Sequence, residues 1–269
     1  MRSLAELMNL TGRGAVVTGG AGHIGFAAAQ ALTELGARVV VLDLDAAPCR
    51  ERADELNRAH PGCARPLACD LADEQATRAA IREAIRAFGS LDVLVHTAAF
   101  VGTTKATGWS VPFERQSVAA WDAGMRVNLT SAFVMAQEAR EALAVSGRGA
   151  IILVSSIYGL VGSDPALYAD TGMNPDRVLA YSASKGGLLQ LMRHLAALFA
   201  PHIRVNAISP GGVARGQPGL FRERYAARTP LKRMATEEDM KGAVAYLASD
   251  LSAYVTGHNL IVDGGWTAW

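Results

Sequence analysis

Short runs rich in Val, Ile and Leu recur along the chain between longer, Ala-rich segments whose apolar residues follow a helical period. Strands that are buried on both faces of a parallel sheet have this uniformly apolar character. Because crossovers between parallel strands are right-handed, the alternation predicts a doubly wound α/β fold with helices on both faces of the sheet. The seven strands are expected at Ala15–Thr18, Arg38–Asp43, Ala64–Cys69, Val93–His96, Ala150–Ser155, Arg204–Ile208 and Asn259–Val262.

No repeat, low-complexity tract or Pro/Ser-rich linker divides the chain, so we expect one domain over residues 1–269. Three connections are longer and less regular than plain turns: Phe100–Ser117, Tyr158–Leu179 and Gly211–Tyr225. Long loops beyond the carboxyl ends of strands usually carry function. We therefore expect these three insertions to border the functional site.

Composition and charge exclude several classes of partner. Half of the 269 residues are apolar and 19% are charged, and the formal net charge is +1 without a long run of either sign. This pattern argues against nucleic acid or an anionic membrane and favours a small-molecule substrate. No stretch of about 18 apolar residues is present and there is no room for a signal peptide before the first strand, so we expect a cytoplasmic protein.

The cysteines and histidines do not indicate a metal site. Cys49, Cys63 and Cys69 are odd in number and lack C-x-x-C spacing. His23 and His96 have no other His, Cys or carboxylate at ligand spacing. We therefore expect no bound metal, and a reducing compartment for the thiols.

A glycine-rich turn joins the first expected strand to the following helix. In the segment T-G-G-A-G-H-I-G, Gly19, Gly22 and Gly25 permit a tight turn whose backbone N–H groups approach a pyrophosphate. The helix N-terminus adds partial positive charge at the same place. Such a turn alone is weak evidence, because many turns contain several glycines for conformational reasons.

The second strand ends in Asp43, 18 residues after Gly25, where a Rossmann fold places the carboxylate that binds the adenosine ribose. An acid there repels a 2′-phosphate, and no Arg or Lys stands in Gly19–Gly25 or Leu42–Ala47 to attract one. We therefore expect NAD rather than NADP. The alternative is that Asp43 only caps the next helix.

Asp70 and Leu71 follow the third expected strand. The Asp70 carboxylate is placed to accept a hydrogen bond from the adenine amino group. The alternative is that Asp70 is the N-cap of the helix beginning near Asp73.

Tyr181 and Lys185 are four residues apart in a segment that reads as a helix to Phe199, so their side chains share one face. A phenol is a poor proton acceptor at neutral pH because its pKa is about 10, and a nearby ammonium favours the phenolate. Taken alone, a tyrosine and a lysine at this spacing are a common surface pair.

Several motifs in order along the chain resemble the short-chain dehydrogenase/reductase family, in its single-domain branch. Tyr181 and Lys185 match the family's Y-x-x-x-K, Ser156 matches the serine that ends the fifth strand, and Asn128 matches the asparagine of the fourth helix. The resemblance implies that Tyr181 exchanges the proton at the alcohol or carbonyl oxygen and Ser156 orients that oxygen. It also implies that Lys185 holds the nicotinamide ribose and Asn128 supports a proton-relay water.

Further matches extend the resemblance over nearly the whole chain. Asn206–Gly212 resembles the turn beside the nicotinamide, and Tyr254–Gly265 resembles the family's last strand region. The family usually forms tetramers, and Trp266 and Trp269 are candidates for an interface. The implied cofactor-binding residues are Gly19, Gly22, His23, Ile24, Gly25, Asp43, Asp70, Leu71, Ala98, Tyr181, Lys185, Pro210, Gly211 and Val213.

Two motifs depart from the family. His23 stands where single-domain members usually have the second glycine, which gives the spacing of the extended branch that modifies sugar nucleotides. Against that branch, the chain leaves no room for a separate substrate domain after the last strand motif. His96–Ala99 reads H-T-A-A where the family usually has N-N-A-G, which puts the local hydrogen bonding beside the cofactor in doubt.

Ser156 and Tyr181 are separated by 25 positions, about twice the family's usual spacing, and the excess lies in Leu160–Arg177. This insertion is expected above the nicotinamide, where its polar side chains favour a polyol, sugar or cyclitol; the alternative is a solvated loop. It also resembles dehydrogenases of bacterial flagellin-glycan and nonulosonate pathways. The polar residues concerned are Tyr168, Asp170, Thr171, Asn174 and Arg177.

The segment Gly211–Tyr225 resembles the family's mobile substrate lid, and its Arg215, Arg222 and Arg224 are suited to a carboxylate or phosphate. The sequence therefore predicts hydride transfer between NAD(H) and a secondary alcohol or ketone of a small polar substrate. The rivals are an epimerase or dehydratase that retains NAD, and a non-enzymatic module that binds NAD as a sensor.

Overall fold

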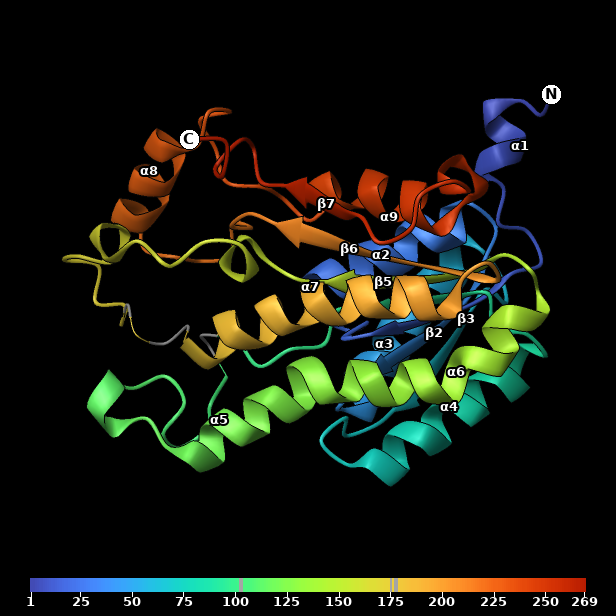
Figure 1. Ribbon diagram of the computed structural model, residues 1–269, viewed down its shortest axis with the longest axis horizontal. Helices are drawn as coiled ribbons and strands as arrows, with labels where there is room; N and C mark the ends of the chain where they lie inside the picture. Colours follow the sequence, from blue (N-terminus) through green and yellow to red (C-terminus); the bar gives the residue numbers. More distant parts are fainter. Residues whose placement is uncertain (102–103, 175, 177–178) are drawn as a thin grey trace.

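The computed structural model describes residues 1–101, 104–174, 176 and 179–269, and they form an α/β molecule around one parallel sheet (Figure 1). The strands are β1 (Gly14–Thr18), β2 (Arg38–Asp43), β3 (Ala64–Ala68), β4 (Val93–His96), β5 (Gly149–Val154), β6 (Ile203–Pro210) and β7 (Asn259–Val262). The helices are α1 (Leu4–Met8), α2 (His23–Glu34), α3 (Ala46–Ala59), α4 (Glu74–Phe88), α5 (Val118–Met125), α6 (Ser131–Val145), α7 (Leu179–Phe199), α8 (Gly219–Arg228) and α9 (Lys241–Ala248).

The sheet has the order β3-β2-β1-β4-β5-β6-β7 and every pairing is parallel. This confirms the doubly wound fold and its seven strands. The order reverses between β1 and β4, and ligands of such sheets bind beyond the carboxyl ends of the strands at that point. The predicted strand bounds are accurate to two residues at every end.

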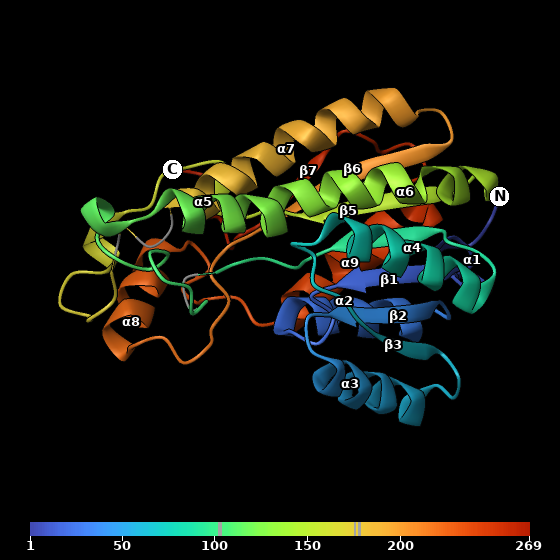
Figure 2. The same cartoon turned by 90° about the horizontal axis from the view of Figure 1, so that it is seen from below.

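Helices cover both faces of the sheet (Figure 2). The helices α4, α6 and α7 bury their apolar sides on one face, where Val16, Leu42 and Ile151 belong to the same core. The helices α2, α3 and α9 pack on the other face, where Val17 and Val41 belong to a second core. Neighbouring strand residues thus point into opposite cores, which explains why the strands are apolar throughout.

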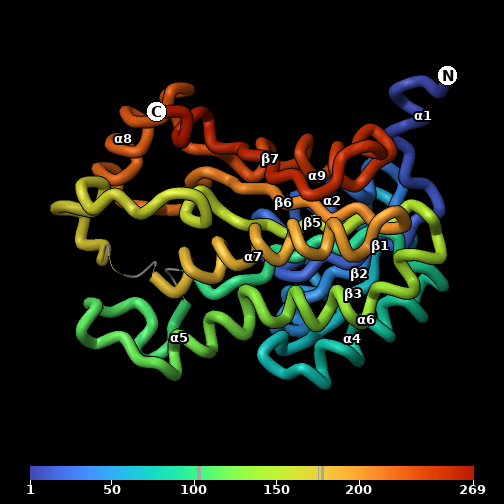
Figure 3. Tube along the Cα trace, in the orientation of Figure 1, coloured from blue at the N-terminus to red at the C-terminus, as the bar shows by residue number. Residues whose placement is uncertain are grey.

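All three insertions lie at the end of the molecule where the chain also finishes, and the N-terminus lies at the opposite end (Figure 3). The insertion over residues 158–179 begins in a helical turn, Ile157–Gly159, and continues through a second turn, Pro165–Leu167. The insertion over residues 211–225 contains the start of α8. Arg177, which we expected to contribute to the substrate site, lies outside the described residues.

Candidate active site

The glycine-rich turn is packed too tightly for side chains. A Cβ atom on Gly25 would meet the Gly19 carbonyl oxygen at 2.0 Å, and Gly19 has a positive φ of +63°. Gly22 precedes α2 and donates its N–H to the Gly19 carbonyl at 3.0 Å. The turn therefore brings bare backbone and the N–H groups of the first turn of α2 to the cavity surface, which fits a pyrophosphate.

Asp43 is joined to this turn. Its Oδ2 accepts a hydrogen bond from the Ala21 N–H at 3.1 Å, and its Oδ1 accepts one from the Leu44 N–H at 2.8 Å. The residue at the N-cap of α3 is Asp45. The alternative that Asp43 caps this helix is therefore not what the structure shows.

The corresponding alternative for Asp70 is also wrong. Asp73 is the N-cap of α4, and its carboxylate accepts from the Ala76 N–H at 3.0 Å. The Asp70 carboxylate accepts from the Ala72 N–H at 2.9 Å and borders the cavity beside Leu71. Asp70 is thus not the N-cap of α4 and lines the cavity.

The end of β5 is fastened to α7, and this contact assembles the reactive residues. The Lys185 ammonium donates to the Val154 carbonyl at 2.7 Å, and the Ser155 hydroxyl donates to the Lys185 carbonyl at 2.8 Å. Ser156 follows β5 rather than ending it, and its hydroxyl accepts from the Tyr158 N–H at 3.1 Å. The Lys185 ammonium also lies 5.5 Å from the centre of the Tyr181 ring.

Tyr181 is partly buried in the cavity wall, and its pKa reflects three influences. Burial raises the pKa of Tyr181, whereas the Ser156 hydroxyl and the charge of Arg215 act in the lowering direction. Burial lowers the pKa of Lys185 to about 7. The cation that lowers the tyrosine pKa here is thus Arg215, which sequence reasoning had assigned only to the lid.

Asn128 lies in a π-helical turn, Arg126–Thr130, between α5 and α6. Its amide donates to the Ser184 hydroxyl at 3.0 Å and to the Phe100 carbonyl at 3.2 Å, and its carbonyl oxygen accepts from the Phe100 N–H at 2.6 Å. The side chain thereby ties α7 to the loop after β4. Irregular turns of this kind recur at functional sites.

His96 explains how the unusual motif after β4 is accommodated. The ring is fully buried, with Nδ1 2.9 Å from the Thr18 hydroxyl and Nε2 3.4 Å from the Asn128 carbonyl oxygen. Burial, and then the charge of Lys185, lower the pKa of His96 to about 3. The histidine is therefore a neutral bridge between β1 and the π-helical turn.

This burial predicts an acid-sensitive stability. The unfolded chain binds a proton at His96 below about pH 6.5, whereas the folded protein does so only near pH 3, so the stabilisation present above pH 6.5 is lost as the pH falls. When the pH falls from about 7 to about 5, the free energy of unfolding measured by urea denaturation should fall by about 2 kcal/mol more for the wild type than for His96→Asn. The exposed change His202→Asn is the control and should follow the wild type. Equal losses in all three proteins would contradict this account.

One cavity of about 730 Å³ joins the two halves of the site. Every residue expected to bind the cofactor lines it, as do Ser156, Tyr181 and Lys185. Asn128 does not line the cavity but lies behind its wall, to which the neighbouring residue Val127 contributes. The structure therefore brings the predicted residues together around a space that runs from Asp43 to Tyr181.

The far wall of the cavity is largely aromatic. Tyr225 stacks on Trp266 with ring centres 4.3 Å apart, and Phe221 and Tyr168 pack beside them. The hydroxyls of Tyr158 and Tyr168 lie 2.9 Å apart. Sequence reasoning missed Tyr158, Phe221 and Tyr225, because a short apolar or aromatic run does not reveal which way it faces.

The insertion contributes fewer polar groups to the cavity than expected. Of the described residues within 160–177, Tyr168 and Met173 line the cavity wall. The Thr171 hydroxyl donates to the Tyr168 carbonyl at 2.6 Å, Asn174 accepts from the Asp176 N–H at 3.0 Å, and Asp170 is exposed beside Arg224. The expectation that Asp170, Thr171 and Asn174 face the substrate is therefore wrong, whereas Tyr168 lines the cavity.

The lid residues also differ in placement. Arg215 lines the cavity, whereas Arg224 donates to the carbonyls of Ala166 and Ala169 and so fastens α8 to the insertion. Arg222 is exposed and is not among the described residues of the cavity wall. Of the three arginines, Arg215 alone is placed to meet a ligand in this cavity.

The two C-terminal tryptophans have different surroundings. Trp266 is buried at 4% exposure in the aromatic wall, so the expectation that it lies at a subunit interface is wrong. Trp269 is 74% exposed, and its indole N–H donates to the Arg228 carbonyl at 3.2 Å.

In the part of the chain that the structure describes, no helix is long and apolar enough to cross a membrane. Within the same residues, no group of three or more His, Cys, Asp or Glu side chains is arranged to hold a metal ion.

Comparison with known proteins places this geometry among dehydrogenases. The family model described as enoyl-(acyl carrier protein) reductase matches residues 19–267. The chain is 38% identical to cis-4-hydroxycyclohexanecarboxylate dehydrogenase of Sinomonas cyclohexanicum, covering 95% of this chain and 97% of that protein. It is 32% identical to D-threitol dehydrogenase of Mycolicibacterium smegmatis, with coverage of 96% and 94%. Among solved structures, NADPH-dependent 3-quinuclidinone reductase from Rhodotorula rubra has a TM-score of 0.86 at 29% identity, with coverage of 100% and 96%.

Proposed function

We propose that this chain, which belongs to the short-chain dehydrogenase/reductase family, transfers a hydride between NAD(H) and a secondary alcohol or ketone of a small polar substrate. As a member of that family it is an oxidoreductase acting on CH–OH groups and uses a nicotinamide cofactor. The observation that carries the proposal is that the glycine-rich turn, Asp43, Ser156, Tyr181 and Lys185 line one cavity.

The dinucleotide would lie along the cavity from Asp70 and Asp43, past the glycine-rich turn, to Pro210 and Gly211. When bound, it supplies the hydride acceptor or donor. The backbone turn at Gly19–Gly25 would hold the pyrophosphate, and Lys185 would hold the nicotinamide ribose. This leaves the space between Tyr181 and the aromatic wall for the substrate.

In the oxidation direction, Tyr181 takes the hydroxyl proton of the substrate while Ser156 holds the same oxygen. The positive charge of Arg215 stabilises the phenolate against the burial that raises the tyrosine pKa. Lys185 places its ammonium 5.5 Å from the centre of the same ring. Asn128 keeps the loop after β4 and helix α7 in register behind the site.

We propose NAD rather than NADP as the preferred cofactor. The Asp43 carboxylate is held against the glycine-rich turn, where a 2′-phosphate would meet its negative charge. No Arg or Lys occurs in Gly19–Gly25 or Leu42–Ala47 to compensate. The NADPH-dependent 3-quinuclidinone reductase shares the fold, so the choice rests on these local residues.

The proposed substrates are sugars, sugar acids, polyols and cyclitols. The relatives named above oxidise, by their names, a hydroxylated cyclohexane acid and a four-carbon polyol. The cavity suits a compact molecule with a hydroxylated frame, because the Tyr158–Tyr168 hydroxyl pair lies beside aromatic side chains in its wall.

The assay that tests the proposal follows NADH formation by its near-ultraviolet absorbance. The purified protein is given NAD or NADP in parallel, with a panel of sugars, sugar acids, polyols, cyclitols, hydroxylated cyclohexane acids and simple secondary alcohols. We expect turnover with NAD and at least one polyhydroxylated or cyclic alcohol. Turnover confined to NADP would contradict the cofactor proposal, and silence across the panel would contradict the substrate proposal.

The tyrosine pair predicts a specificity effect. Tyr168→Phe removes one hydroxyl and leaves the Tyr158 hydroxyl without this partner at 2.9 Å. For a polyol substrate, kcat/KM should fall about five- to twentyfold, mainly through a higher KM, since a substrate hydroxyl left unpaired in the cavity costs about 1–3 kcal/mol. For a substrate with one hydroxyl the change should stay within about twofold. A uniform loss over all alcohols would mean that the pair serves the fold and not the substrate.

We also propose a one-domain, cytoplasmic homotetramer with a small-molecule substrate and no nucleic-acid or membrane partner. Exposed apolar side chains on α5 and α6, including Val118, Trp121 and Phe133, support self-association. Sedimentation equilibrium should give the mass of four chains; a monomer at micromolar concentration would contradict the tetramer.

A further inference from the structure

The side chains of His23 and Arg215 meet at one carboxylate oxygen of Glu237, and the three residues come from distant parts of the chain. Glu237 Oε1 lies 3.0 Å from His23 Nδ1 and 3.5 Å from Arg215 Nε. His23 is the first residue of α2, Arg215 lies in the loop after β6, and Glu237 lies in the turn before α9. His23 and Arg215 both line the cavity proposed for the dinucleotide.

The loop that carries Arg215 is paired with the turn that carries Glu237. The Ala214 N–H donates to the Ala235 carbonyl at 2.9 Å, and the Ala235 N–H donates to the Gly212 carbonyl at 2.9 Å. Arg215 directly follows the paired residue Ala214, and Glu237 comes two residues after the paired residue Ala235. The backbone pairing therefore keeps the two residues close to each other.

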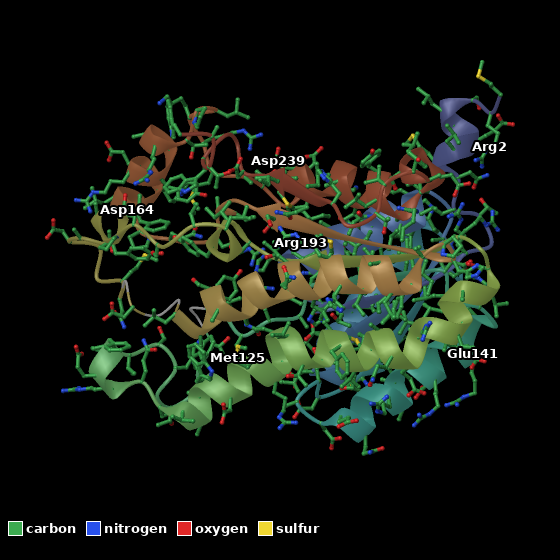
Figure 4. The ribbon with its side chains drawn as sticks, viewed as in Figure 1. Arg2, Met125, Glu141, Asp164, Arg193 and Asp239 are labelled. Carbon is green, nitrogen blue, oxygen red and sulfur yellow. The ribbon has the colours of Figure 1, made fainter. Side chains whose placement is uncertain are left out.

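The turn that carries Glu237 is fixed from its other side by Asp239, which is labelled in Figure 4. The Asp239 carboxylate accepts two hydrogen bonds from the Arg233 guanidinium, at 2.6 and 2.7 Å, and one from the Thr236 N–H at 2.7 Å. These bonds, led by the one from Arg233, hold the pKa of Asp239 well below its usual range. Glu237 thus stands on an ordered turn between Thr236 and Asp239.

Glu237 is not among the described residues that line the cavity, whereas its two partners are. The Glu237 carboxylate therefore contacts His23 and Arg215 from behind the cavity wall, while these two side chains border the cavity. Burial lowers the pKa of Arg215, and the Glu237 charge acts in the raising direction, which keeps the guanidinium charged. The arrangement bridges the glycine-rich turn and the loop after β6.

We propose that Glu237 is a positioning residue for the cofactor, which through His23 and Arg215 clasps the loop after β6 to the glycine-rich turn and slows release of the bound dinucleotide. The proposal rests on the proposed use of NAD(H). It also gives His23 a role, because glycine, the residue that single-domain family members usually have at this position, has no side chain to reach Glu237.

The size of the effect follows from the exposure of the three side chains, which lies between 32% and 61%. Ion pairs this accessible to water contribute little each, so two contacts on one carboxylate should change a release rate about three- to tenfold. Because salt screens accessible charges, the difference between the wild type and a variant without the clasp should shrink at high ionic strength.

Stopped-flow fluorescence of NADH release tests the clasp in the full-length protein. Glu237→Gln should release NADH about three- to tenfold faster than the wild type and raise the KM for NAD, with the KM for the alcohol unchanged. Glu238→Gln, which removes an exposed carboxylate one residue away, is the matched control and should release NADH at the wild-type rate. The thermal midpoints of all three proteins establish that each is folded.

His23→Gly provides the second variant. It should release NADH faster by a similar factor, and the double variant with Glu237→Gln should be little faster than either single one, because both changes open the same clasp. If Glu237→Gln bound NADH normally but released it at an unchanged or slower rate, the clasp would be overturned and the proposed function would stand. A slower release would mean that the Glu237 carboxylate competes with the pyrophosphate for His23 and Arg215. Failure of the wild type to bind NADH would contradict the proposed function, and the clasp with it.

Discussion

Tyr181→Phe is expected to lower kcat about 10²–10⁴-fold while NADH binding changes little. The phenol is the group proposed to exchange the substrate proton, and positioned acid–base groups contribute about this much to a rate. The partly buried ring lies beside Lys185, so phenylalanine fills the same space and removes only the hydroxyl. The two readouts are NADH formation at saturating substrate and NADH affinity by fluorescence.

Tyr158→Phe is the matched control for this experiment. Tyr158 also lines the cavity and is partly buried, and its hydroxyl bonds to Tyr168. Its loss should change kcat far less than the loss of the Tyr181 hydroxyl. If Tyr181→Phe kept more than about a tenth of the wild-type kcat with NADH bound normally, Tyr181 would not be the proton-exchanging residue.

Asp43→Asn is expected to change the preference for NAD over NADP about 10²-fold. The carboxylate is the negative charge proposed to accept from the ribose hydroxyls and repel a 2′-phosphate. Asparagine keeps the size and one acceptor for the Ala21 or Leu44 N–H, so the turn should stay folded. We expect kcat/KM to fall about tenfold with NAD and to rise about tenfold with NADP.

Asp45→Asn separates a specific effect from a general one. Asp45 is exposed, lies two residues away, and makes no side-chain capping bond to α3. This control should leave the cofactor preference within about twofold of the wild type. An Asp43→Asn protein that lost activity with NAD without gaining any with NADP would show that the carboxylate serves the turn rather than the choice of cofactor.

Much of the fold could be predicted because it depends on local patterns. Val39–Leu42 are apolar since both faces of the sheet are covered, and this continuous character identifies a buried parallel strand. Gly19 and Gly25 could be singled out because backbone there approaches backbone more closely than a Cβ atom allows. The spacing of Tyr181 and Lys185 is local too, and one helix, α7, carries both residues.

What could not be predicted depends on contacts between distant segments. Glu237 lies beside Arg215 because Ala235 pairs with the loop after β6, and nothing near Glu237 in the sequence indicates this. The same holds for Trp266, whose burial comes from stacking on Tyr225. The polar residues of the insertion were misinterpreted because Thr171 serves equally well to bond a substrate or to close its own turn.

The most direct test of the account uses an alcohol that the protein oxidises and that carries deuterium on its carbinol carbon. The protein is incubated with NAD and this alcohol, and the released dinucleotide and the product are analysed by mass spectrometry. The account predicts one deuterium in each released NADH and a ketone in equal amount. It would be contradicted by a product of unchanged oxidation state that retains the deuterium, with no NADH released, as an NAD-retaining epimerase would give.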